Sequence, residues 1–145
     1  MYKNLIFATF LLLFFACVDA ESAKHHNIQD AKWTAVMANH DVVMPMMGTT
    51  NKVRKKLKSV LAAKENLPVE KTEKINALII DLDKADESMM DWMNGFPQLK
   101  KLQAEKDHKE IIKFLDEQDV VIKGVGMRMT NSIKAGLDYV ERLEQ

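Results

Sequence analysis

Apolar side chains recur every three or four residues along most of this 145-residue chain, and this spacing is the strongest constraint on its fold. The pattern fills three stretches, at residues 29–64, 70–93 and 105–143. Glycine and proline, with 5 and 3 residues, are scarce, whereas methionine occurs 10 times. This composition favours helices over sheets. We therefore predict three long helices.

Two short connections separate these helices. Residues 66–68 (Asn-Leu-Pro) follow the first helix, and residues 94–97 (Asn-Gly-Phe-Pro) follow the second. Short connections between long helices place sequence neighbours antiparallel. The predicted fold is therefore all-α, an antiparallel bundle of three long helices that forms one domain over residues 29–145.

A proline and three glycines interrupt the helical pattern. Pro45 lies inside the first helix, where a proline removes a backbone donor and costs about 3 kcal/mol. The bundle has four helices if the first one breaks at Pro45. In the third helix, Gly124, Gly126 and Gly136 each cost about 1 kcal/mol relative to alanine, which predicts close packing or a bend near residues 124–126.

The N-terminus has the pattern of an export signal. Lys3 precedes an unbroken apolar run over residues 5–16, and Cys17, the only cysteine, follows it. A run of about a dozen residues is shorter than the roughly 20 that a membrane-spanning helix needs. We therefore expect residues 1–17 to be a signal peptide that is removed from the mature protein.

Two cleavage sites are possible. Residues 14–17 (Phe-Phe-Ala-Cys) resemble a bacterial lipobox, in which the cysteine becomes acylated; residues 18–20 (Val-Asp-Ala) instead suit ordinary cleavage before Glu21. We favour acylation of Cys17, because a single thiol cannot form a disulfide within its chain and lies where the apolar run ends. The prediction is a lipoprotein of the cell envelope, anchored in the outer or inner membrane. Residues 18–28 have no apolar period and are predicted to be a polar tether.

The charges are balanced, with 21 basic and 21 acidic residues, so no excess of positive charge favours nucleic acid. Five cations and five anions nevertheless form two clusters. They are Lys52, Arg54, Lys55, Lys56 and Lys58 on the first helix, and Asp81, Asp83, Asp86, Glu87 and Asp91 on the second. Antiparallel packing would bring the clusters face to face, so we predict ion pairs that fix this helix pairing.

Signatures of catalysis are missing from the sequence. It contains no G-x-S-x-G, H-E-x-x-H, G-x-x-x-x-G-K or C-x-x-C motif. Its many carboxylates lie on helix faces, with no feature that marks an acid–base pair. We therefore expect a protein without enzymatic activity and without a cofactor.

Histidine and methionine form the one cluster that suggests chemistry. Its members are His40, Met44, Met47, Met89, Met90, Met93 and His108. The first three have the spacing i, i+4, i+7 of one helical face, and minimal turns would bring all seven to one end of the bundle. Thioether and imidazole ligands suit Cu(I) rather than calcium or magnesium. The favoured alternative is that these side chains only fill the core, as methionine commonly does.

Two runs in this cluster resemble a known group of proteins. H-D-V-V-M-P-M-M at residues 40–47 and M-M-D-W-M at residues 89–93 are similar to segments of small, uncharacterised helical lipoproteins of Gram-negative bacteria. Some of these carry the label viral A-type inclusion protein. The similarity covers most of residues 30–143. It implies a lipid-anchored helical bundle and supplies no activity.

Two functions are therefore compatible with the sequence. The favoured one is a non-enzymatic, envelope-anchored lipoprotein with a structural or protein-binding role. The alternative is a periplasmic lipoprotein that binds or handles Cu(I), with ligands drawn from His40, Met44, Met47, Met89, Met93 and His108.

Overall fold

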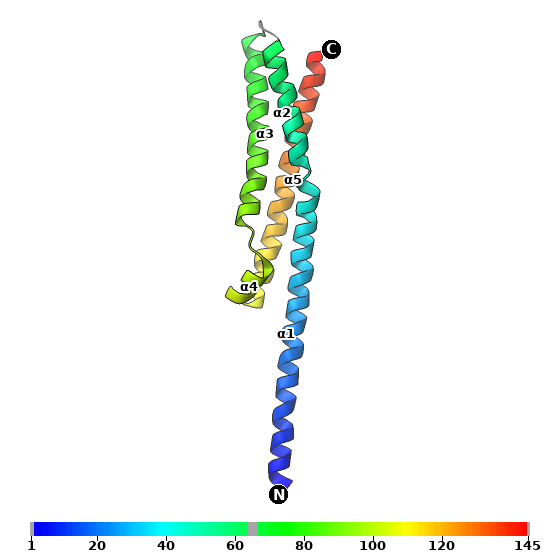
Figure 1. The fold of residues 1–145 in the computed structure, drawn as a ribbon, viewed down its shortest axis with the longest axis vertical. Helices are drawn as coiled ribbons and strands as arrows, with labels where there is room; N and C mark the ends of the chain where they lie inside the picture. Colours follow the sequence, from blue (N-terminus) through cyan, green and yellow to red (C-terminus); the bar gives the residue numbers. More distant parts are fainter. Residues whose placement is uncertain (1, 64–66, 145) are drawn as a thin grey trace.

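The molecule is a bundle of long helices. The computed structural model describes residues 2–63 and 67–144, with side chains described over 21–63 and 67–143. The helices are α1 (Tyr2–Val43), α2 (Met46–Ala63), α3 (Val69–Gly95), α4 (Leu99–Glu105) and α5 (His108–Glu144), and these residues contain no strand. α1 and α2 follow one another, α3 returns antiparallel to them, and α5 runs beside all three (Figure 1). The predicted all-α bundle is confirmed.

The first predicted helix is broken at Pro45. Met44 N–H still donates to His40 O at 2.8 Å, but Pro45 has no N–H with which to continue the helical ladder. Met47 N–H donates to Met44 O at 3.2 Å, so the chain makes a tight turn before α2 resumes the helix. The four-helix form of the prediction is therefore the observed one, with α4 as an additional short helix.

The helix α1 starts well before residue 29. Residues 18–28, predicted to be a tether outside the bundle, belong to α1. No glycine or proline precedes Pro45 in the sequence, so nothing breaks the helix; the missing apolar period reflects only that most of these side chains face solvent. Within this segment His25 packs against α5, because its ring stacks on that of His108 at a centroid distance of 3.8 Å.

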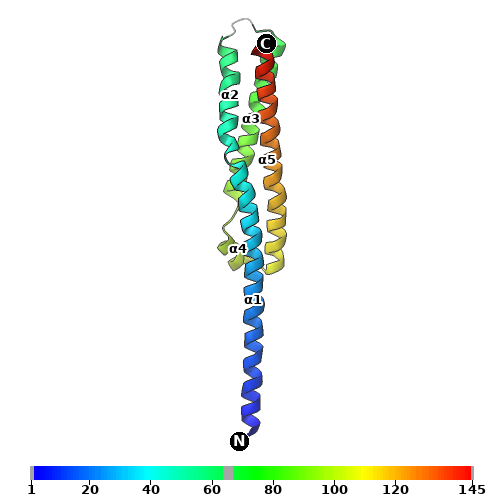
Figure 2. The same ribbon diagram turned by 90° about the vertical axis from the view of Figure 1, so that its right-hand side faces the viewer.

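The N-terminal part of α1 projects beyond the other helices (Figures 1 and 2). The predicted signal peptide, with Cys17, lies outside the residues whose side chains are described. Among the described residues, no helix combines the length and the apolar character that a membrane crossing requires.

The connection between α3 and α5 contains the short helix α4, which the sequence analysis treats as part of a loop. Leu102 of α4 is buried with Ile111 and Leu115 of α5. α5 begins at His108, later than the predicted residue 105. Asp107 fixes this start, because its Oδ1 accepts from Glu110 N–H at 2.9 Å while Glu110 Oε2 accepts from Asp107 N–H at 3.1 Å. This reciprocal pair is a capping box.

Close packing, rather than a bend, explains two of the three glycines of α5. A Cβ atom on Gly136 would lie 2.5 Å from Val53 Cγ1, and one on Gly126 would lie 2.8 Å from Val43 Cγ2. Because glycine has no Cβ atom, Val53 of α2 and Val43 of α1 can lie close to the α5 backbone at these two positions. A Cβ atom on Gly124 would meet nothing within 4 Å.

Arg54 carries the predicted pairing between α2 and α3. Its Nε lies 2.6 Å from Asp83 Oδ1 as an ion pair without hydrogen-bond alignment, and its Nη2 donates to Asp86. Thr50 Oγ1 also donates to Asp86. The charged clusters therefore meet, and among the described residues Arg54 forms the ion pairs from the basic cluster to the acidic one.

The glycines give a matched pair of stability predictions. Gly124→Ala should raise the free energy of unfolding by about 0.5–1 kcal/mol, because alanine has the higher helix propensity and the site is open. Gly136→Ala should lower it by about 1–3 kcal/mol, because the added methyl group forces Val53 away. Urea unfolding followed by circular dichroism measures both. Shifts in the same direction would contradict the packing described here.

Candidate functional site

A hollow between α1 and α3 gathers aromatic, sulfur and imidazole side chains. Its volume is about 230 Å³. Residues at spacing i, i+4, i+7 of α1 form one wall, and the end of α3 with the following connection forms the other. We call it the Met–His cavity, and its lining residues are Trp33, Met37, His40, Trp92, Met93, Phe96, Pro97 and Gln98.

His40 is held in a defined orientation at this cavity. Its ring stacks on Trp92 with 5.6 Å between centroids and 26° between planes. Its Nδ1 lies 2.9 Å from Asp41 Oδ1. The side chain is only 15% exposed, whereas that of Asp41 is largely in solvent. The carboxylate therefore engages Nδ1, so Nε2 is the ring nitrogen that can act as an acceptor or a ligand.

Aromatic rings form the floor of the cavity. Phe96 stacks on Trp92 at 4.7 Å and on Trp33 at 6.2 Å, and it also reaches Phe114 of α5 at 6.2 Å. The Nε1 atoms of both tryptophans are buried, with no hydrogen-bond acceptor among the described residues. Packing therefore fixes the two indole rings, while their N–H groups donate no hydrogen bond to a described residue.

The structure divides the His/Met cluster predicted from the sequence. His40 and Met93 line the Met–His cavity. Met89 is completely buried in the bundle interior, and Met47 packs against the same interior cluster. Met44 and Met90, at 39% and 43% exposure, point to the outside. Met37 lines the cavity but is absent from the predicted set, although its position three residues before His40 was a usable signal.

His108 lies apart from the other predicted residues. Its ring stacks on His25 at 7° between planes, and its Nδ1 lies 3.2 Å from Gln29 Nε2. Gln103 Nε2 of α4 donates to Gln29 Oε1 at 3.0 Å. Because His25 precedes His40 by 15 residues on the same helix, this network lies about 22 Å from His40 along α1. The structure therefore does not bring His108 to the Met–His cavity.

The register of α3 against α5 explains this separation. Arg128 Nη1 donates to Ser88 Oγ at 2.8 Å, so residues near 128 of α5, not His108, lie beside Met89. His108 would lie beside the methionines of α3 only if a minimal turn near residue 99 joined α3 to α5. Instead, the connection between α3 and α5 contains the helix α4 and is longer than a minimal turn. The start of α5, with His108, therefore lies at the far end of the bundle.

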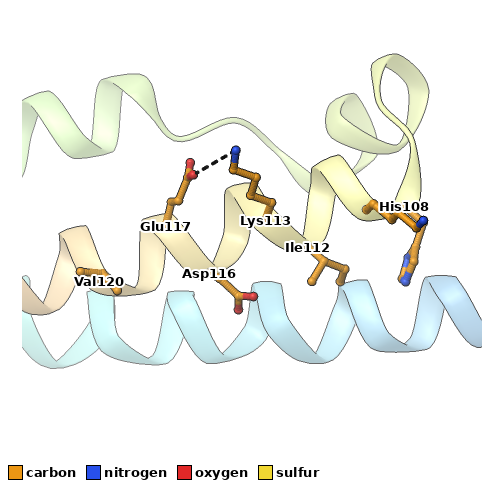
Figure 3. A pocket seen from close by; sticks show the side chains of 7 residues that line it. His108, Ile112, Lys113, Asp116, Glu117 and Val120 are labelled. Carbon is orange, nitrogen blue, oxygen red and sulfur yellow. Dashed lines mark ion pairs between the residues drawn. The ribbon is translucent and has the colours of Figure 1, made fainter.

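Three further cavities lie along α5, and two of them are bordered by exposed valine or methionine side chains. Figure 3 shows one of about 570 Å³, in which Lys113 and Glu117 form an ion pair at 3.9 Å while Asp116 lies toward α1. This cavity includes His108 but no methionine. The other cavity, of about 410 Å³, lies between α1 and α5 and is bordered by Val42 and Met127.

Groups of three or more histidine, cysteine, aspartate or glutamate side chains placed to hold a metal ion do not occur in the described part of the chain. No protein-family model, curated protein or solved structure matches the sequence or the fold.

The division of the methionines predicts unequal effects of truncation. Met89→Ala should lower the free energy of unfolding by about 2–5 kcal/mol, because it leaves a cavity in the interior. Met44→Ala, on the exposed side of the Pro45 turn, should change it by no more than about 0.5 kcal/mol. Chemical denaturation of the two variants tests this placement. Similar losses for both would show that Met44 is buried as well.

Proposed function

We propose that this chain is a non-enzymatic helical lipoprotein of the cell envelope that binds another protein through the face where α1 and α5 run side by side. The observation that carries the proposal is the exposure of three apolar side chains there. Val42, Val120 and Met127 are 67%, 70% and 65% exposed. Apolar side chains that cluster beside cavities on a surface mark sites of protein interaction.

The three side chains follow the long axis of the bundle. Val42 of α1 and Met127 of α5 border the same 410 Å³ cavity. Val120 lies two helical turns before Met127, on the same side of α5, and borders the neighbouring 570 Å³ cavity. We define these three residues and the two cavities as the α1–α5 face.

Polar groups border the α1–α5 face. Asp119 accepts a hydrogen bond from Asn39 Nδ2 at 2.6 Å and pairs with Lys123 Nζ, also at 2.6 Å. Lys32 pairs with Asp116 nearby. An apolar strip with a polar border is the usual anatomy of a protein interface. Since the strip runs parallel to two helices, it suits an amphipathic helix of the partner, whose apolar side chains would enter the cavities.

Anchoring through Cys17 rests on the sequence pattern and on the resemblance to lipoproteins of Gram-negative bacteria. Cys17 lies eight positions before His25, whose ring stacks on His108 of α5. Over a continuous helix this spacing amounts to about 12 Å. An acylated Cys17 would therefore hold the bundle close to the membrane surface.

Photocrosslinking in cells tests the proposed interface. A photoreactive residue at position 127 or 42 should give a discrete adduct with a partner, because both positions border the same cavity. Position 80 on α3 is the matched control, since Ile80 is also an exposed apolar residue, at 51%. Met127→Glu should remove the adduct formed at position 42. An adduct of twice the protein's own mass would identify a second copy as the partner.

Equal adducts at positions 80 and 127, or none at positions 42 and 127, would contradict the proposed interface.

Cys17→Ser tests the anchor. The variant should lose incorporated palmitate, because no thiol is left to accept the diacylglycerol, and the protein should leave the membrane fraction or accumulate as the precursor. Cell fractionation and metabolic labelling measure these outcomes. Unchanged labelling and fractionation would disprove the lipoprotein assignment while leaving the interface untouched.

A further inference from the structure

The Met–His cavity has the donor chemistry of a site for a soft metal ion. Two thioethers and one imidazole line it, contributed by Met37, Met93 and His40. They come from two helices, α1 and α3, so the three residues line one cavity only in the folded bundle. No carboxylate lines this cavity, and a set of sulfur and imidazole donors favours Cu(I) over calcium, magnesium or manganese.

His40 has the surroundings expected of a metal-binding histidine. Its Nδ1 is engaged by the Asp41 carboxylate at 2.9 Å, which fixes the tautomer and leaves Nε2 for a ligand. A carboxylate on the second ring nitrogen is the usual arrangement behind a metal-bound histidine, because it orients the ring and makes it more basic. Stacking on Trp92 limits the rotation of the ring further.

The size and walls of the cavity also suit a single ion. A volume of about 230 Å³ is below the roughly 300–1,000 Å³ typical of sites for drug-sized ligands. Trp33 and Trp92 supply aromatic faces, which attract cations through their negative π surfaces. Core packing alone accounts for the methionines, so the orientation of the His40 ring by the Asp41 carboxylate is the observation that favours a metal ion.

We propose that the Met–His cavity is a Cu(I) site with His40 Nε2, Met37 Sδ and Met93 Sδ as ligands. This ligand set differs from the one predicted from sequence. It excludes Met44, Met47, Met89 and His108, because none of them lines the cavity. Met44 faces outward, Met89 is completely buried in the interior, and His108 stacks on His25 near the other end of the bundle.

Anaerobic titration with Cu(I) against a competing chelator tests the proposal. The protein is the full chain in detergent, carrying Cys17→Ser throughout, because the only thiol would otherwise compete for Cu(I). Both tryptophans of the chain line the cavity, so intrinsic fluorescence reports on this site. We expect one Cu(I) per chain, with a change in fluorescence that saturates at the same stoichiometry.

Variants locate the ligands. Met37→Leu and Met93→Leu preserve side-chain volume, and His40→Phe preserves the stack on Trp92. Each should weaken Cu(I) binding at least tenfold, while helical content and the thermal midpoint stay close to those of the parent protein. Met44→Leu and Met127→Leu are matched controls outside the cavity, and His108→Phe tests the distant histidine pair. These three should keep the parent affinity.

Two results would overturn the proposal. One is a parent protein that binds no Cu(I), or binds it without a change in tryptophan fluorescence. The other is binding that Met44→Leu or His108→Phe weakens as much as Met37→Leu does. Neither result bears on the crosslinks expected at positions 42 and 127, so the copper site and the protein interface fail independently.

Discussion

Burial of the apolar stripe of α5 is the interaction on which the rest of the structure depends. Six side chains of this helix are almost inaccessible to solvent: Ile111, Leu115, Ile122, Val125, Met129 and Val140. They form the interior with α1 and α4 at one end, with α1 and α3 in the middle, and with α2 and α3 at the other end. α1 and α2 lie end to end across the Pro45 turn and contact each other little. Packing of both helices against α5 therefore keeps them aligned.

The long helices and the break at Pro45 were predictable because they depend on local chemistry. The apolar spacing of α2, α3 and α5 appears directly in the sequence, and Pro45 breaks the first helix as the loss of its N–H requires. Residues 18–28 show the limit of this argument. A missing apolar period indicates that a segment does not pack along one face; it does not indicate that the segment lacks a helix.

The candidate site was predictable only in part, because it depends on the register between helices. His40 and Met93 were expected together, and they do line one cavity. His108 was misplaced because α4 lengthens the path from α3 to α5, and no rule of minimal turns anticipates such an insertion. Met37 was treated only as a core residue. It lines the cavity because the packing of α1 and α3 brings Met37 and Met93 to the same hollow.

The position of α5 in the chain sets the order in which this molecule can fold. Residues 108–144 are synthesised after α1, α2 and α3, yet they supply the buried stripe that all three of these helices require. An unfinished chain can form isolated helices and the pairing of α2 with α3, but it cannot close its core. Such a chain therefore lacks a closed core until α5 has been synthesised.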